Sequence, residues 1–202
     1  MADDRWIDSV RQGGVLRFAS GRTLHGGSWR DVLTASVSEI NSLLQTKNVG
    51  LQFEQAAEAA AAHLQIEATA GQIPAEAGGG TLQADGRHGA TRLTLVGRRG
   101  DDESALRAQS GRIFVPLAPA GHRTRPPRGM MQVMMVHELL HAAGLRAHNN
   151  AMGDIMTGQM EDGSGGKVHP WGGLGQDMPP CVLGGGTVTR LHALWGQRLS
   201  SP

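Results

Sequence analysis

The run His137-Glu138-Leu139-Leu140-His141 lies in a stretch that predicts a buried helix over about 130–143. This stretch is apolar nearly all round, which is typical of a helix inside a protein. Histidines four residues apart project from one face of a helix, so two imidazoles can reach one zinc ion. Glu138 lies between them, where its carboxylate can polarise a zinc-bound water. The stretch therefore predicts a zinc site and a catalytic glutamate on one helix.

The residues after this helix offer a third ligand. Gly144 follows His141 by three positions and can take the left-handed conformation that ends a helix. The chain then turns back toward the metal, and His148 follows soon after. We therefore expect His148 to complete the set of protein ligands and to leave a fourth position for water.

The sequence from His137 to His148, followed by Asp154-Ile155-Met156-Thr157, resembles the metzincin zinc peptidases. Their motif is H-E-x-x-H-x-x-G-x-x-H followed by a methionine turn. In the matrixin-like branch the methionine lies eight residues beyond the third histidine, and Met156 lies eight residues beyond His148. The motif places its third histidine where Ala147 stands, so the turn in this chain has one additional residue.

Apolar periodicity on both sides of the zinc helix predicts an α+β domain. Alternation predicts strands, and apolar residues at three- and four-residue steps predict helices. The predicted strands cover about 15–20, 51–54, 63–68, 91–96 and 111–117, and the predicted helices about 30–46, 130–143 and 187–199. Their order resembles the upper part of matrixin-like domains. The implied fold is a metzincin-like catalytic domain with a twisted mixed sheet, a backing helix, an active-site helix and a loop-rich lower part that ends in a C-terminal helix.

We interpret residues 1–202 as a single catalytic domain, with an upper part of about 15–145, a lower part of about 146–202 and a cleft between them. Pro116 suggests limited pairing for its strand, near an edge or an end of the sheet. A substrate would lie extended and antiparallel to the 91–96 or the 111–117 strand, bound through its main chain.

Composition argues against several classes of partner. The 19 Lys and Arg residues are scattered and balance 18 Asp and Glu, so neither nucleic acid nor an anionic membrane is expected. A single cysteine, Cys181, excludes a disulfide framework within the chain. No run reaches the roughly 18–20 apolar residues of a membrane span, and the first residues lack the pattern of a signal peptide. We therefore expect a soluble chain. The sequence does not determine its compartment, and delivery outside the producing cell is a hypothesis.

The resemblance implies a zinc-dependent endopeptidase. His137, His141 and His148 would hold one catalytic zinc ion, and Glu138 would be the general base for the zinc-bound water that attacks the scissile bond. Met156 would form the methionine turn. The partner would be a protein or peptide substrate. A protein inhibitor and a larger parent chain are further partners that the sequence allows.

Other ligands and other activities also stay open. Glu161 lies twenty residues beyond His141, the spacing of the glutamate ligand in gluzincins, but the glycines around it disfavour a helix. His169 is a further candidate ligand, and Cys181 resembles the cysteine switch of matrixin propeptides. The same histidines would serve a zinc amidase acting on cell-wall peptide, a peptidase toxin or effector domain cut from a larger secreted protein, or a zinc-stabilised binding module.

The segment 157–187 follows the methionine turn and carries the apolar residues Trp171, Leu174 and Met178. In metzincins this segment walls the pocket for the side chain just after the scissile bond. The resemblance therefore implies an apolar preference at that substrate position, worth about 1.5–3 kcal/mol for one buried side chain.

Overall fold

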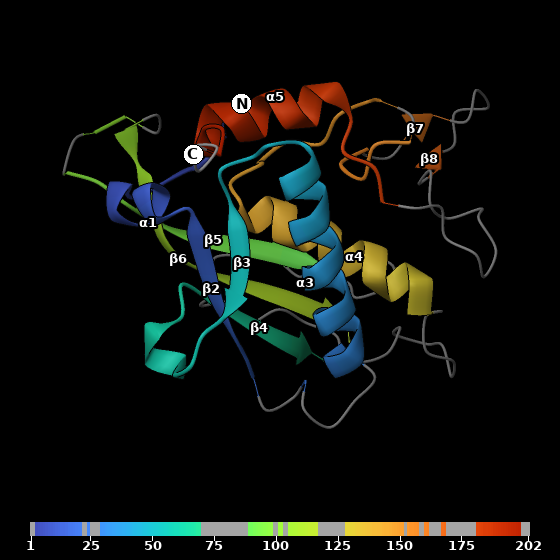
Figure 1. Ribbon diagram of the computed structural model, residues 1–202, viewed down its shortest axis with the longest axis horizontal. Coiled ribbons are helices and arrows are strands. Elements are labelled where there is room, and N and C mark those ends of the chain that lie inside the picture. Colours follow the sequence, from blue (N-terminus) through green and yellow to red (C-terminus); the bar gives the residue numbers. More distant parts are fainter. Residues whose placement is uncertain are drawn as a thin grey trace.

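The structure of the 202-residue chain is a computed structural model (Figure 1). It describes residues 3–21, 24, 29–69, 89–98, 101–102, 105–116, 128–151, 153–157, 160–161, 167–168 and 181–198. For residues 116, 160–161 and 167–168 it describes the backbone alone.

A mixed six-stranded sheet forms the centre of the fold. Its strands are β1 (Arg5–Trp6), β2 (Val15–Ser20), β3 (Gln52–Gln55), β4 (Leu64–Thr69), β5 (Ala90–Val96) and β6 (Arg107–Pro116). The order β1-β6-β4-β2-β3 is parallel throughout, and β5 pairs with β6 in the antiparallel direction. The alternation in the sequence predicted the five longer strands, because their apolar residues face the core at every second position.

Strand β6 lies inside the sheet and not at its edge. Its first residues pair with β1 and its later residues pair with β4, while β5 runs along its other side. Pro116 was expected near an edge or an end. It is the last residue of β6, so the end is confirmed, whereas the edge was wrong because β6 has neighbouring strands on both sides. The strand also begins at Arg107, four residues earlier than predicted, within a stretch that the sequence marks as polar.

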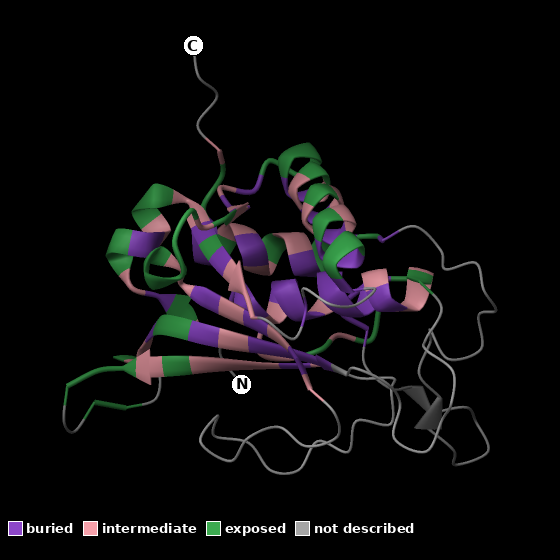
Figure 2. Cartoon of the chain, turned by 90° about the horizontal axis from the view of Figure 1, so that it is seen from below, coloured by how far each residue is buried: buried purple, intermediate pink, exposed green. Residues whose placement is uncertain are grey.

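Two long helices cover one face of this sheet. Helix α3 (Trp29–Thr46) packs on β3 and on α4 (Arg128–Ala142), and α4 also packs on β5 and β6. Figure 2 shows both helices on the same side of the strands, with buried residues concentrated between the two layers. The apolar stripe predicted for α3 is buried at Val32, Leu33, Ile40 and Leu44.

Helix α4, which carries His137, Glu138 and His141, is buried on almost every side, as its apolar composition predicted. The buried residues of α4 are Met131, Val133, Met134, Met135, Val136, Glu138, Leu139, Leu140 and Ala142. Three methionines of this helix, Met131, Met134 and Met135, therefore lie in the core, where a flexible thioether fills irregular space.

The chain ends in helix α5 (Gly185–Trp195), and Gly196 follows with a φ of 74°. The helix begins two residues earlier than the predicted 187–199 and ends four residues earlier, because the backbone leaves the helical region at Gly196. Three short elements are α1 (Asp8–Gly13), the 3-10 helix η1 (Ala59–Ala61) and the hairpin of β7 (Met160–Glu161) with β8 (Lys167–Val168). Among the described residues, no helix combines the length and the apolar character that crossing a membrane requires.

Candidate metal centre

Three histidines meet near the C-terminal end of α4. The Nε2 atoms of His137 and His141 lie 3.0 Å apart. Nε2 of His148 lies 3.0 Å from that of His137 and 3.2 Å from that of His141. Among the side chains that the structure describes, these three form the cluster that can hold a metal ion.

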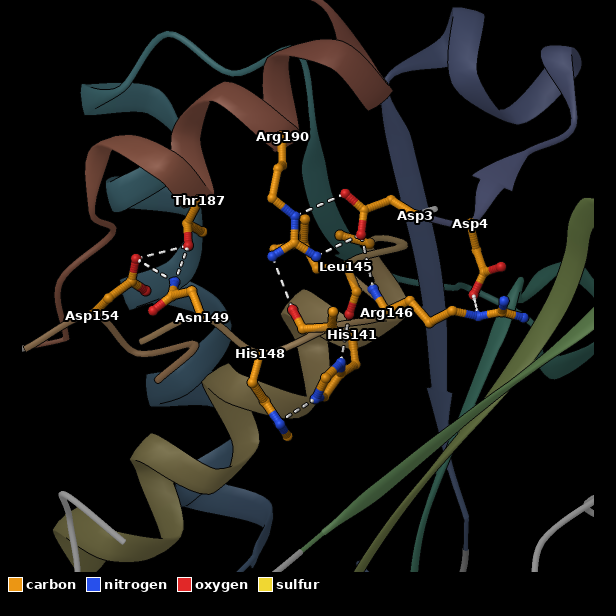
Figure 3. A network of polar contacts seen from close by, with 12 residues as sticks. Asp3, Asp4, His141, Leu145, Arg146, His148, Asn149, Asp154, Thr187 and Arg190 are labelled. Carbon is orange, nitrogen blue, oxygen red and sulfur yellow. Dashed lines mark hydrogen bonds and ion pairs between the residues drawn. The ribbon is translucent and has the colours of Figure 1, made fainter. Parts of the chain in front are cut away.

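Local folding explains why the three side chains converge. His137 and His141 lie one turn apart on α4, so both rings leave the same face of the helix. The helix ends at Ala142, and Gly144 reverses the chain with a φ of 105°. A Cβ at Gly144 would also collide with the carbonyl oxygen of Asp4, so this position requires glycine. The turn that follows brings His148 back beside His141 (Figure 3).

Hydrogen bonds made by Nδ1 of two rings identify Nε2 as the nitrogen that can bind a metal ion. Nδ1 of His137 donates to the Ile155 carbonyl oxygen at 2.8 Å, and Nδ1 of His141 donates to the Leu145 carbonyl oxygen at 2.6 Å. A carbonyl oxygen can only accept, so Nδ1 carries the proton in both rings and the Nε2 lone pairs point to the centre. Such bonds also fix the orientation of each ring.

The protonation state suits a metal. Burial is the main reason that the pKa of His141 is lowered to about 4; the hydrogen bond to the Leu145 carbonyl acts in the opposite direction, and the electrostatic effects of the nearby His148 and Arg190 side chains add to the lowering. His141 is therefore neutral at neutral pH, and the neutral imidazole is the form that binds metal ions.

The donor set fits zinc. Ligands at about 2.0–2.1 Å from a tetrahedral ion are about 3.3–3.4 Å from one another. The three Nε2 separations of 3.0–3.2 Å are within a few tenths of an ångström of that value. Nitrogen donors also favour zinc over magnesium and calcium, which prefer oxygen, and three histidines are a ligand set of catalytic zinc sites.

Strand β5 holds the carboxylate of Glu138. This side chain is buried, with 4% of its surface exposed. Oγ1 of Thr91 donates to Oε2 of Glu138 at 2.7 Å and also lies 3.0 Å from the Glu138 carbonyl oxygen. A Cβ at Gly89 would stand 2.6 Å from Cγ and 2.9 Å from Oε1 of Glu138. A hydroxyl at residue 91 and the absence of a side chain at residue 89 therefore shape the space that the carboxylate occupies.

The surroundings of Glu138 bring its proton affinity close to neutrality. Burial raises the pKa of Glu138 to about 7, while the hydrogen bond from Thr91 and the charge of Arg92 act in the opposite direction. A carboxyl group with such a pKa can both accept and release a proton at neutral pH.

A buried carboxylate ties the chain after His148 to the start of α5. Met156 is fully buried, and its amide donates to Oδ1 of Asp154 at 2.8 Å. Oδ2 of Asp154 accepts from Asn149 Nδ2 at 2.9 Å, from Thr187 Oγ1 at 2.7 Å and from the Gly184 amide at 3.1 Å (Figure 3). The role of Met156 as a methionine turn stays a prediction, and the Asp154 carboxylate accepts four hydrogen bonds within and beside its loop.

Replacing Asp154 by Ala should lower the free energy of unfolding by about 3 kcal/mol or more, because four donors lose a buried acceptor. Urea denaturation of the metal-free protein measures this value. Glu58→Ala is the matched control, since Glu58 is exposed and makes no side-chain capping bond to η1, and a change within about 0.5 kcal/mol is expected there. Equal effects for the two variants would show that the Asp154 network carries no stability.

Several predicted residues lie outside this cluster or outside the described part of the chain. Glu161 lies in β7, which forms a short hairpin with β8 and not the helix that a gluzincin ligand requires. The side chain of Glu161 and all of His169, Trp171, Leu174 and Met178 lie outside the described residues. The apolar pocket proposed for the 157–187 segment therefore stays a prediction.

Cys181 lies in the core beside α3. Its amide donates to Oε1 of Glu39 at 3.3 Å, and Glu39 also accepts from Gln132 of α4. Burial, with the Glu39 carboxylate adding to it, raises the pKa of the Cys181 thiol far above its usual range. The thiol is therefore protonated, whereas a zinc ligand must be a thiolate.

Two residues that shape the site could not be found from the sequence. Thr91 and Gly89 lie more than forty positions from Glu138, and neither belongs to a motif. Their contact with Glu138 depends on the packing of β5 against α4.

No family model matches the chain, and no curated protein is similar to it in sequence. Among solved structures, the chain is similar to that of myroilysin at 9% identity, with a TM-score of 0.49 and coverage of 96% of this chain and 97% of that one. It is also similar to the GM1-bound form of the ECX AB5 holotoxin at 13% identity, with a TM-score of 0.41 and coverage of 99% and 79%.

Proposed function

We propose that the chain is a zinc-dependent endopeptidase of the metzincin type. The observation that carries this proposal is the meeting of three Nε2 atoms, from His137, His141 and His148, on the helix that also bears the buried Glu138. The matrixin-like assignment is supported by the step of eight residues from His148 to Met156 and by the order of strands and helices around α4.

In this proposal the three imidazoles hold the ion, and zinc when bound supplies Lewis acidity toward a water molecule and the scissile carbonyl. Glu138 accepts the proton of the water as its oxygen attacks the carbonyl carbon. Glu138 then passes this proton to the nitrogen of the leaving amine as the peptide bond breaks. Thr91 keeps the carboxylate in place through its bond to Oε2.

The sheet offers an edge for the substrate. Strand β6 is paired on both sides, whereas β5 lies outside β6 in the described sheet. An extended peptide binds such an edge through main-chain hydrogen bonds. Because Thr91 of β5 also contacts Glu138, a peptide along this strand would pass close to the proposed base. Of the two strands that the sequence suggested, β5 is therefore the substrate strand in this proposal.

The test combines metal analysis with substrate profiling of the purified chain. We expect about one zinc ion per chain and internal cleavage of peptides in an unbiased library. Removal of zinc by a chelator should stop cleavage, and added zinc should restore it. Zinc binding without any hydrolysis would favour a binding module, and release of products from cell-wall peptides alone would favour an amidase.

Replacing Thr91 by Val should lower kcat by about 10- to 100-fold while KM and zinc content stay unchanged. Valine keeps the shape of threonine but removes a hydrogen bond to a charged group, which is worth about 1.5–3 kcal/mol. Thr91→Ser is the matched control, because it keeps the hydroxyl and should retain most of the activity. Equal losses in both variants would mean that packing, and not the hydroxyl, matters at this position.

A further inference from the structure

The turn that leads from α4 to His148 is held by both ends of the chain. Carbonyl groups at the end of a helix and in the turn after it lack a helical donor and need other partners. The donors here are Trp6 Nε1 to Ala142, Trp195 Nε1 to Ala143, the Asp4 amide to Gly144 and Arg190 Nη1 to Ala147, each at 2.8 Å. Two of the donors precede β2, and the other two lie on α5.

Asp3 and Arg190 form the central pair of this arrangement. Nε of Arg190 donates to Oδ2 of Asp3 at 2.8 Å, and Nη2 donates to Oδ1 at 2.5 Å. Oδ1 of Asp3 also accepts from the Arg146 amide at 3.1 Å. Arg190 also donates to the Ala147 carbonyl oxygen. The pair therefore makes hydrogen bonds to the main chain of both residues that precede His148, Arg146 and Ala147 (Figure 3).

This pair differs from an ordinary surface ion pair. The side chains of Asp3 and Arg190 are 17% and 25% exposed. Two parallel hydrogen bonds join the carboxylate to the planar guanidinium, and such forked pairs are strong and directional. A third N–H group of the same guanidinium reaches the Ala147 carbonyl oxygen, and the ammonium group of a lysine lacks the planar fork that makes this arrangement.

We propose that Asp3 and Arg190 are positioning residues for His148. They hold the main chain at residues 146 and 147 before the metal binds, so that Nε2 of His148 stands beside the other two donor atoms in the metal-free protein. The turn has one residue more than the metzincin motif, and the pair holds this longer turn in place. The proposal rests on the metal site proposed above.

Preformation has a measurable consequence for metal affinity. If the turn is ordered during folding, zinc does not have to order it on binding, and the affinity is higher. Loss of groups that orient metal ligands typically weakens binding about 10–100-fold. A pair that only stabilises the fold would act equally on the metal-free and the zinc-bound protein, and it would leave the affinity unchanged.

The experiment measures the zinc Kd of the full chain by competition with a chromophoric chelator. Asp3→Asn and Arg190→Gln should each raise Kd about 10-fold, and the double variant should raise it no further, because the two residues act as one unit. Arg190→Lys keeps the charge but loses the fork, and it should also raise Kd. Glu67→Gln is the matched control, since it removes the partner of Arg112, held at 2.8 Å on the sheet, and should leave Kd unchanged.

The outcomes separate this inference from the function that it rests on. Wild-type affinity in Arg190→Lys and Asp3→Asn, even with a lower stability of the metal-free protein, would overturn the positioning role and leave the zinc site intact. An increase in Kd for Glu67→Gln as large as for Asp3→Asn would overturn it as well. Failure of the wild-type chain to bind zinc would overturn the metal site itself, together with the peptidase proposal.

Discussion

Glu138→Ala is expected to keep about one zinc ion per chain and to lower kcat for peptide cleavage by about 10²–10⁴-fold. The metal should remain because its three proposed ligands are histidines. Activity should fall because the variant removes the group that takes the proton of the attacking water and returns it to the leaving amine. Steady-state kinetics on a peptide found in the library, with metal analysis of the same sample, measures both quantities.

Glu138→Gln separates the loss of the proton acceptor from the loss of shape. The amide still fills the space between Gly89 and Thr91, where the carboxylate lies against β5. We expect kcat to fall as far as in Glu138→Ala, since an amide is not a base at neutral pH. Near-native activity in either variant would reject Glu138 as the general base.

His141→Ala is expected to lose stoichiometric zinc together with the stabilisation that zinc provides. A ligand that binds only the folded state stabilises it by about 4.1 kcal/mol when its free concentration is about 1,000 times Kd. The wild-type chain should show this increase in the free energy of unfolding on addition of zinc, and His141→Ala should show none. Urea denaturation with and without zinc is the measurement.

His192→Ala is the matched control for this experiment. The ring of His192 lies on α5 and contacts the Lys47 carbonyl oxygen, away from the three-histidine cluster, so zinc binding should survive its loss.

A second comparison of variants identifies the third zinc ligand. If Glu161→Gln empties the site and His148→Gln does not, the gluzincin assignment replaces the one proposed here. Stoichiometric zinc in a chain that lacks both His137 and His141 would reject the site altogether.

Local patterns were sufficient for most of the secondary structure. Alternation and three- to four-residue steps located five strands and three helices because the pleat and the helical turn impose those periods on any half-buried element. The pairing of the strands could not be predicted in this way. The 107–110 part of β6 lacks a clear apolar alternation and becomes a strand because β1 and β5 flank it.

The same division applies to the site. The spacing of His137 and His141 is a property of one helix, and Gly144 ends that helix through its own conformational freedom, so both could be inferred from neighbouring residues alone. The hydroxyl that holds Glu138 and the ion pair that holds the His148 turn come from residues 47 and 187 positions away from their partners. Contacts at such separations leave no periodic signal in the sequence. They exist only because the sheet, α4 and α5 pack into one structure and bring distant residues together.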